Sequence, residues 1–202
     1  MVAPDYIVGG TLTDGEAWVA IEVAEPSGAD VAFTPGTGTQ NWSQYQDLVI
    51  IAYLQIVGSA SGGYGEFKIN FNNDTTANMY RNQNMYSYAS TTSASPYLAA
   101  RGHLGYVSSA TASPGANTFS MAIINIFDIN AAKEKVVTCQ CAADYAGGSS
   151  ISGWTGLNTI TYTGNTDGQA PITEIDLANS AGTGWSSGSR FDLFGVLPRM
   201  VS

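Results

Sequence analysis

The longest apolar run of the chain spans residues 46–58 and reads QDLVIIAYLQIVG. In an extended strand, alternate side chains point to opposite faces, and here both faces are apolar. One face has Leu48, Ile50, Ala52, Leu54 and Ile56, and the other has Val49, Ile51, Tyr53 and Val57. A helix is the alternative, but Val and Ile are poor helix formers and no capping box precedes the run. The run therefore predicts a central β-strand that is covered on both faces.

Other segments show the period of two that is typical of strands, and turns rich in Gly, Ser and Pro separate them. The clearest are residues 66–71 (EFKINF) and 118–129 (TFSMAIINIFDI). In a further segment, EAWVAIEVAE, we expect Trp18, Ala20 and Val23 to point inward. Eight or nine such segments without a convincing helix predict an all-β fold, an antiparallel β-sandwich of the single jelly-roll kind.

The domain is expected to span residues 16–202, with residues 1–15 as an extended N-terminal arm or an edge strand. The inward positions of the alternating strands predict one core, formed by Leu48, Ile50, Leu54, Ile56, Phe67, Ile69, Phe71 and Phe191. Residues 72–95 are long, polar and rich in Tyr, Asn and Met, so we expect a loop that contacts a ligand or another subunit.

The charge of the chain bounds its partners. Only 11% of the residues are charged and the formal net charge is −9, with 7 basic residues that form no cluster. We therefore expect no nucleic-acid partner. No apolar run reaches the roughly 18 residues that a membrane span needs, so no membrane partner is expected either. Cys139 and Cys141 are too far apart as neighbours on one strand face for an unstrained disulfide. Two free thiols fit synthesis in a reducing cytoplasm.

No constellation of residues predicts catalysis. His103 is the only histidine, and a catalytic triad or a zinc site needs partners that the chain barely has. We expect no enzyme, no metal and no cofactor, although a pair of carboxylates for glycoside hydrolysis stays open. Aromatic residues in the expected loops, such as Trp154 and Tyr86, could stack on sugars, fill a subunit interface or pin their own loops to the core.

Four segments together resemble a family of tailed-phage virion proteins, the jelly-roll head decoration (cement) proteins. They are WSQYQDLVIIAYLQ (residues 42–55), FNNDTTANMY (71–80), INIFDINAAKEKVV (124–137) and SGSRFDLFGV (187–196). The resemblance gives structural weight to Trp42, Asp47, Asn72, Asp74, Lys135, Trp154, Gly188, Ser189 and Gly195. The chain departs from the family pattern at Leu54 and Gln55, where an Arg often follows the apolar run, and at Phe194, where Tyr is usual. The first 40 residues do not match.

The resemblance implies a viral structural protein that binds the outer surface of a phage head, with the major capsid protein as partner and the capsid exterior as location. The alternative is a tail or spike protein that binds host-surface glycan. Because the second face of the central strand is too apolar to meet water, residues 72–95 or a neighbouring subunit must cover it. We expect a homotrimer, with an interface formed by Val49, Ile51, Tyr53, Val57, Tyr80, Tyr86 and Tyr88.

Overall fold

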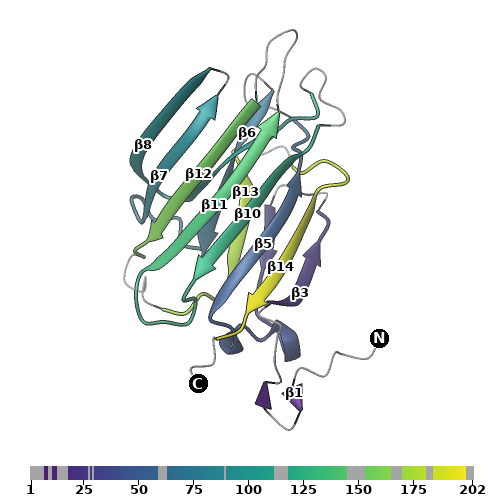
Figure 1. The fold of residues 1–202 in the computed structure, drawn as a ribbon, viewed down its shortest axis with the longest axis vertical. Helices are drawn as coiled ribbons and strands as arrows, with labels where there is room; N and C mark the ends of the chain where they lie inside the picture. The colour runs from purple at the N-terminus through teal and green to yellow at the C-terminus, as the bar shows by residue number, and fades with distance from the viewer. Residues whose placement is uncertain are drawn as a thin grey trace.

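The computed structural model describes residues 7–8, 11–12, 18–26, 28, 30–58, 63–88, 90–111, 118–144, 153–164, 170–180 and 184–198. These residues form two antiparallel β-sheets that pack face to face, as the sequence predicted (Figure 1). Among these residues, helix is confined to two short 3₁₀ turns before the central strand, η1 (Gly38–Gln40) and η2 (Trp42–Gln44).

The larger sheet has eight strands and faces the viewer in Figure 1. Their spatial order is β3 (Trp18–Ala24), β14 (Arg190–Val196), β5 (Asp47–Leu54), β10 (Ser120–Phe127), β11 (Lys135–Asp144), β12 (Gly153–Tyr162), β7 (Tyr80–Tyr88) and β8 (Thr91–Ala99). The smaller sheet lies behind it. Its order is β4 (Asp30–Phe33), β13 (Ile175–Asn179), β6 (Tyr64–Phe71) and β9 (Gly102–Ser108).

The pairing of eight of these strands is that of a jelly roll. When the hairpins β7–β8 and β11–β12 are set aside, the first strand pairs with the last: β3 with β14, β4 with β13, β5 with β10 and β6 with β9. This nested pairing arises when one long hairpin folds over on itself into two sheets. The two hairpins are additions, and both extend the larger sheet beyond β10.

The core lies between the sheets and confirms the predicted inward positions. All eight residues expected there have no exposed surface, and they are Leu48, Ile50, Leu54, Ile56, Phe67, Ile69, Phe71 and Phe191. Aromatic rings from distant segments meet in it, since Trp185 contacts both Phe67 and Phe191 edge-on. Cys139 and Cys141 are buried free thiols on one strand face, as predicted.

The first strand of the jelly roll reverses the predicted orientation. Trp18, Ala20 and Val23 are exposed, whereas Ile21 is buried. The strand pairs with β14 through a bulge between Leu193 and Phe194, and Trp18 leans against the ring of Phe194 on the outer side, with 5.8 Å between ring centroids. A bulge shifts the inward phase by one residue, so strict alternation cannot describe the whole of β3.

The polar segment 72–95 is not a loop. Residues 80–88 form strand β7, which pairs with β12 along its whole length and with β8 on its other side, and β8 itself begins at Thr91. The hairpin lies at one edge of the larger sheet, next to β12. Three strands, β10, β11 and β12, separate it from β5. It therefore does not cover β5, which was one of the two alternatives for the apolar second face.

Only part of the expected N-terminal arm is among the described residues. β1 (Ile7–Val8) and β2 (Thr11–Leu12) pair with each other and with no strand of the two larger sheets. The other residues of the segment 1–15 lie outside the described part of the chain.

Candidate interaction surface

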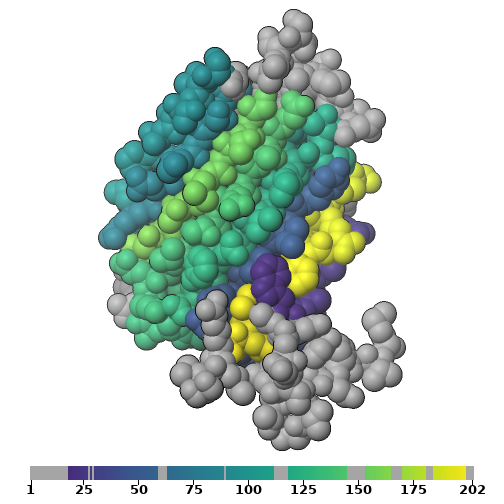
Figure 2. All heavy atoms as spheres, in the orientation of Figure 1, coloured from purple at the N-terminus to yellow at the C-terminus, as the bar shows by residue number. Residues whose placement is uncertain are grey.

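The outer face of the larger sheet is the side that is turned away from the smaller sheet, and it presents apolar side chains to solvent. Outward positions alternate with core positions on each strand. Five of the outward side chains are between 37% and 57% exposed, namely Ile51, Tyr53, Met85, Met121 and Leu157. They come from β5, β10, β12 and β7, four of the five neighbouring strands β5, β10, β11, β12 and β7, so they lie on one face of the sheet. Figure 2 shows the molecule with this face toward the viewer.

A shallow groove of about 430 Å³ crosses this face. Its floor follows one row of small side chains, because Ala142 pairs with Thr155 and Thr155 with Ser87. Met121 stands beside Ala142, and Leu157 is paired with Met85 on the neighbouring row. Long side chains thus rise on both sides of short ones, and the groove is mainly apolar.

The middle of the outer face has no charge. On β5, β10, β11, β12 and β7, the only charged outward residues are Asp47, Asp144 and Arg81, at or next to strand ends. Arg81 also lies 3.7 Å from Glu134, which compensates it. A partner that docks on the middle of this face therefore has no charged side chain to desolvate.

Two of the predicted interface residues lie on this face. Ile51 and Tyr53 point outward from β5, and the ring of Tyr53 is stacked on Phe119 with 4.6 Å between centroids. Val57 is exposed but follows the end of β5, where its backbone N–H donates to the carbonyl of Gly184. Val57 is therefore beside the sheet and not on its face.

The prediction for Val49 and Tyr80 is wrong. Val49 is on the outward side of β5, but only 3% of it is exposed between its cross-strand neighbours Phe194 and Asn125. Tyr80 is fully buried: its hydroxyl donates to the carbonyl of Asp74, and its ring stacks on Tyr162 at 4.8 Å. Burial raises the pKa of Tyr80 above its ordinary value. Neither side chain can contact a second subunit.

Tyr86 and Tyr88 lie on the inward side of β7. Tyr86 is half-buried and stacked on the indole of Trp154, at 6.1 Å between centroids. Tyr88 is exposed at the end of the strand, opposite Trp154 and Thr91. The tyrosine-rich segment thus contributes to the core and to the hairpin edge and does not form a single surface.

Sequence reasoning missed Met85, Met121 and Leu157. Both phases of β10 are apolar, so the sequence alone does not say whether Met121 faces the core or solvent. Met85 lies in the segment 72–95, for which the sequence predicts a loop. Long side chains lie next to small ones of adjacent strands at these positions. This pattern can be recognised only when the register of the strands is known, so the sequence alone offers no signal for it.

Residues 72–74 (Asn-Asn-Asp) form a turn that follows the end of β6 and is held by side-chain hydrogen bonds. Asn72 and Asn73 have positive φ values of 53° and 56°, which Asn tolerates better than most residues. The Oδ1 of Asn72 accepts from the backbone N–H groups of Thr173 and Glu174. Asp74 accepts from the Tyr162 hydroxyl at 2.9 Å and from the backbone N–H of Thr76. The turn ties β6 to the segment before β13.

Lys135 is buried, and backbone carbonyl groups accept the hydrogen bonds of its ammonium. Its ammonium donates to the carbonyls of Ala131 and Lys133, and burial lowers its pKa. In the same turn the Asp47 carboxylate accepts from the backbone N–H of Asp128 at 2.7 Å. A hydrogen bond from Lys133 lowers the pKa of Asp128. These contacts fix the connection between β10 and β11.

The remaining motif residues also hold the fold together. Ser189 Oγ accepts from the N–H of Gln55 and donates to its carbonyl, and Gly188 precedes it with a φ of 90°. At Gly195 a Cβ would come within 2.4 Å of the Tyr45 ring, so this close approach requires glycine. Trp42 and Trp154 are buried, Trp42 in η2 and Trp154 in β12. None of these residues lies on the outer face.

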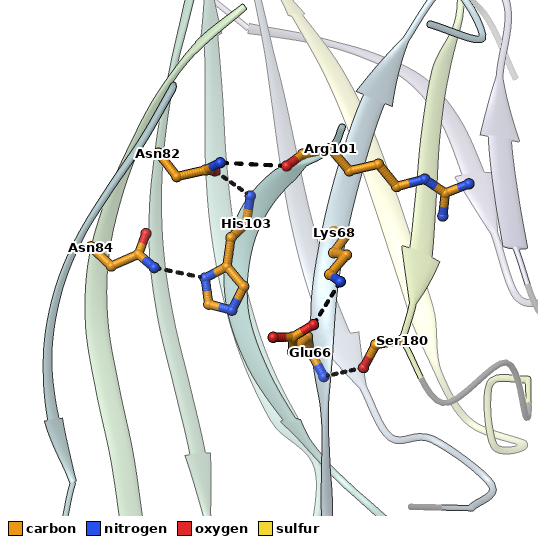
Figure 3. A network of polar contacts seen from close by, with 7 residues as sticks. All are labelled: Glu66, Lys68, Asn82, Asn84, Arg101, His103 and Ser180. Atoms are coloured by element: carbon orange, nitrogen blue, oxygen red, sulfur yellow. Dashed lines mark hydrogen bonds and ion pairs between the residues drawn. The ribbon is translucent and has the colours of Figure 1, made fainter. Parts of the chain in front are cut away.

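A polar network joins the hairpin β7–β8 to the smaller sheet (Figure 3). Asn82 accepts from the backbone N–H of His103 at 2.6 Å, and Asn84 lies 3.2 Å from the Nδ1 atom of the same residue. Only 4% of His103 is exposed, and burial lowers its pKa to about 4. Glu66 partly opposes this shift. The imidazole is therefore neutral at pH 7 and acts as a packed, hydrogen-bonded core group.

Within the described ranges, no three side chains of His, Cys, Asp or Glu are placed to share a metal ion. In the same part of the chain, no helix has the length and apolar character needed to cross a bilayer. Comparisons of the chain with models of protein families, with curated proteins and with solved structures found no match.

Proposed function

We propose that this chain is a structural protein of a tailed-phage virion, a decoration protein that binds the outer surface of the head and stabilises it. The observation behind the proposal is the outer face of the larger sheet, with exposed apolar side chains, a groove and no charge in its middle. Contiguous apolar patches of this kind mark sites of protein–protein contact. We assign this contact to neighbouring copies of the chain, and the resemblance of four segments to head decoration proteins supplies the surface on which the assembled copies sit, the major capsid protein.

The scaffold suits a particle component. A jelly roll with a buried core and strongly paired strands presents a fixed surface, so little conformational entropy is lost on docking. The low charge of the chain also fits a protein whose surface is covered by other subunits. The alternative, a tail or spike protein that binds glycan, draws on the exposed tyrosines at the hairpin edge, Tyr88 and Tyr97.

The charge distribution supports self-association. A chain with a net charge of −9 repels its own copies over most of its surface. The middle of the outer face is free of charge, so two copies can approach there without this repulsion. Closed rings are the usual arrangement of identical subunits, and the resemblance to decoration proteins makes the ring a trimer.

Copy number in purified particles tests the location. A decoration protein is expected in numbers that scale with the major capsid protein, which densitometry of a gel of purified virions measures. Heads stripped of the protein should also lose integrity at a lower temperature than decorated heads. A handful of copies per particle would contradict the head location and support the tail alternative.

Light scattering tests the trimer. The expected mass is three times the 21.1 kDa of one chain. Leu157→Asp should reduce it to the monomer mass, because its cross-strand neighbours Gln140 and Met85 are uncharged and each copy would bury an unpaired charge at the contact. Thr37→Asp is the control, since it places the same charge at the exposed N-cap of η1, outside the larger sheet, and should leave the mass unchanged. A monomer in the wild type at micromolar concentration would contradict self-association through this face.

A further inference from the structure

A second cavity, of about 260 Å³, opens at the edge of the sandwich between the smaller sheet and the end of β8. Its lining combines charged, aromatic and small side chains from β6, β8 and the connection to β9, and consists of Glu66, Lys68, Tyr97, Ala99, Ala100 and Arg101. The volume is slightly below the roughly 300 Å³ at which pockets hold drug-sized ligands. It suits a single small ring or group.

Arg101 is the unusual residue in this cavity. Its side chain is half-buried, and within the described part of the chain its guanidinium makes no hydrogen bond or ion pair. The other basic residues of that part all have partners: Lys68 has Glu66, Arg81 has Glu134, Lys133 has Asp128, Arg190 has Asp192, and Lys135 has two carbonyls. In a protein with more than twice as many acidic as basic residues, an unpaired arginine is unexpected.

The nearby carboxylates are engaged elsewhere. Glu66 is paired with Lys68 at 2.6 Å, and Asp176 accepts a hydrogen bond from Asn70 at 2.7 Å. Burial raises the pKa of Asp176, and the positive charge of Arg101 partly opposes this rise. Within the described part of the chain, the five N–H donors of Arg101 therefore have no protein acceptor of their own, and the residue lines the cavity.

The backbone fixes the position of this arginine. Arg101 lies in the two-residue connection between β8 and β9, and its carbonyl accepts from the Asn82 amide at 3.5 Å. The next strand is held by the hydrogen bond between the His103 N–H and Asn82. Figure 3 shows the Arg101 side chain leaving this anchored point and extending across β6, on the side of the sheet where Lys68 and Glu66 project.

We propose that this cavity binds the carboxylate of an acidic sugar. A guanidinium matches a carboxylate with two parallel N–H donors, and Lys68 adds a second positive charge to the rim. Glu66 makes a doubly charged phosphate less suitable, but its oxygens can accept hydrogen bonds from sugar hydroxyls. Tyr97, 40% exposed, offers an aromatic ring for the apolar side of a sugar, and Ala99 and Ala100 leave room for it. The proposal is independent of the head location.

Calorimetric titration of the full chain with methyl glucuronide tests the proposal, with methyl glucoside and acetate as comparison ligands. We expect methyl glucuronide to bind at least tenfold more tightly than either, because only it offers both the carboxylate and the ring. Arg101→Gln should weaken binding by about tenfold to a hundredfold, the effect of losing charge-assisted hydrogen bonds. Arg81→Gln, an exposed arginine on the other side of the hairpin, should change nothing.

Arg101→Lys is a second test, since it keeps the positive charge and removes the bidentate hydrogen bonding of the guanidinium. This variant should bind methyl glucuronide at least fivefold more weakly than the wild type. Circular dichroism should be unchanged in both variants, because the Arg101 side chain holds no part of the fold. Equal binding of glucuronide and glucoside, or full binding by Arg101→Gln, would overturn the carboxylate site. Acetate that binds as tightly as methyl glucuronide would overturn the sugar.

Discussion

The larger sheet buries its inward side in two different ways. Under the smaller sheet, β5 and β10 point Leu48, Ile50, Ile124 and Ile126 into a dry apolar core, and none of these has exposed surface. Against β9, the edge strand of the smaller sheet, β7 points Tyr80, Asn82, Asn84 and Tyr86 inward. There the two asparagines meet a backbone N–H and a ring nitrogen of His103.

The outermost strand shows the difference most clearly. β8 has no buried position, and it pairs only with β7. One half of the sheet is thus stabilised by the removal of apolar surface from water, and the other by hydrogen bonds and by pairing to its neighbour. The two halves should respond to different perturbations, although they belong to one sheet.

The largest expected effect is a truncation in the apolar half. Leu48→Ala should lower the free energy of unfolding by about 2–5 kcal/mol, because it removes fully buried methyl groups and leaves a cavity. Urea unfolding followed by tryptophan fluorescence measures the change. A loss below about 1 kcal/mol would mean that the core around β5 relaxes into the space and is less tightly packed than the structure indicates.

The same contrast explains what the sequence could predict. The core positions of β6 followed from strict alternation of apolar and polar residues, and those of β5 from the period of two within an apolar run; all were correct. The sequence predicts a loop for residues 72–95 because the inward positions of β7 and β8 there are Asn, Tyr and Ser, so the period of two has no contrast in hydrophobicity. The strand character of β7 comes from pairing with β12, whose residues lie 66 to 82 positions further along the chain, and sequence patterns do not identify this partner.

The candidate surface was predictable only in part. Ile51 and Tyr53 were correctly placed on the second face of β5, but Tyr80 was assigned by composition of its segment and proved to be a core residue. Its burial depends on the turn at Asp74, which accepts its hydroxyl hydrogen bond. Arg101 could not be singled out from the sequence. It makes no ion pair because the neighbouring carboxylates, Glu66 and Asp176, are bonded to Lys68 and Asn70, and these contacts depend on the fold.

An intermediate effect is expected from acid in the polar half. The pKa of buried His103 is about 4, compared with an ordinary value of 6.5, so the folded state binds its proton less readily than the unfolded state. The stability due to the neutral imidazole is complete above pH 6.5 and is lost as the pH falls towards 4. The loss should approach about 3 kcal/mol, from roughly 2.5 pKa units.

The matched variant for this experiment is His103→Gln, which cannot titrate but can still accept from Asn84. Urea unfolding of both proteins at several values between pH 7 and pH 4 separates the histidine from the carboxylates, which are common to the two. The wild type should lose more stability than the variant over this range. Parallel curves would show that His103 is accessible to protons in the folded protein, and that the hairpin does not seal it.

The smallest effect is expected at the open edge. Leu98→Ala removes the same atoms as Leu48→Ala, but Leu98 is 56% exposed on β8, so the free energy of unfolding should change by no more than about 0.5 kcal/mol. Its outward side chain lies opposite Arg81, and both residues line a separate shallow pocket and not the groove. Measured at low protein concentration, the two leucine variants compare the two halves of the sheet with one chemical change.

If Leu98→Ala were destabilising only at concentrations where the protein self-associates, the hairpin edge would belong to the subunit contact. A loss as large as that of Leu48→Ala in the monomer would instead show that β8 is covered, and that the two halves of the sheet are built in the same way.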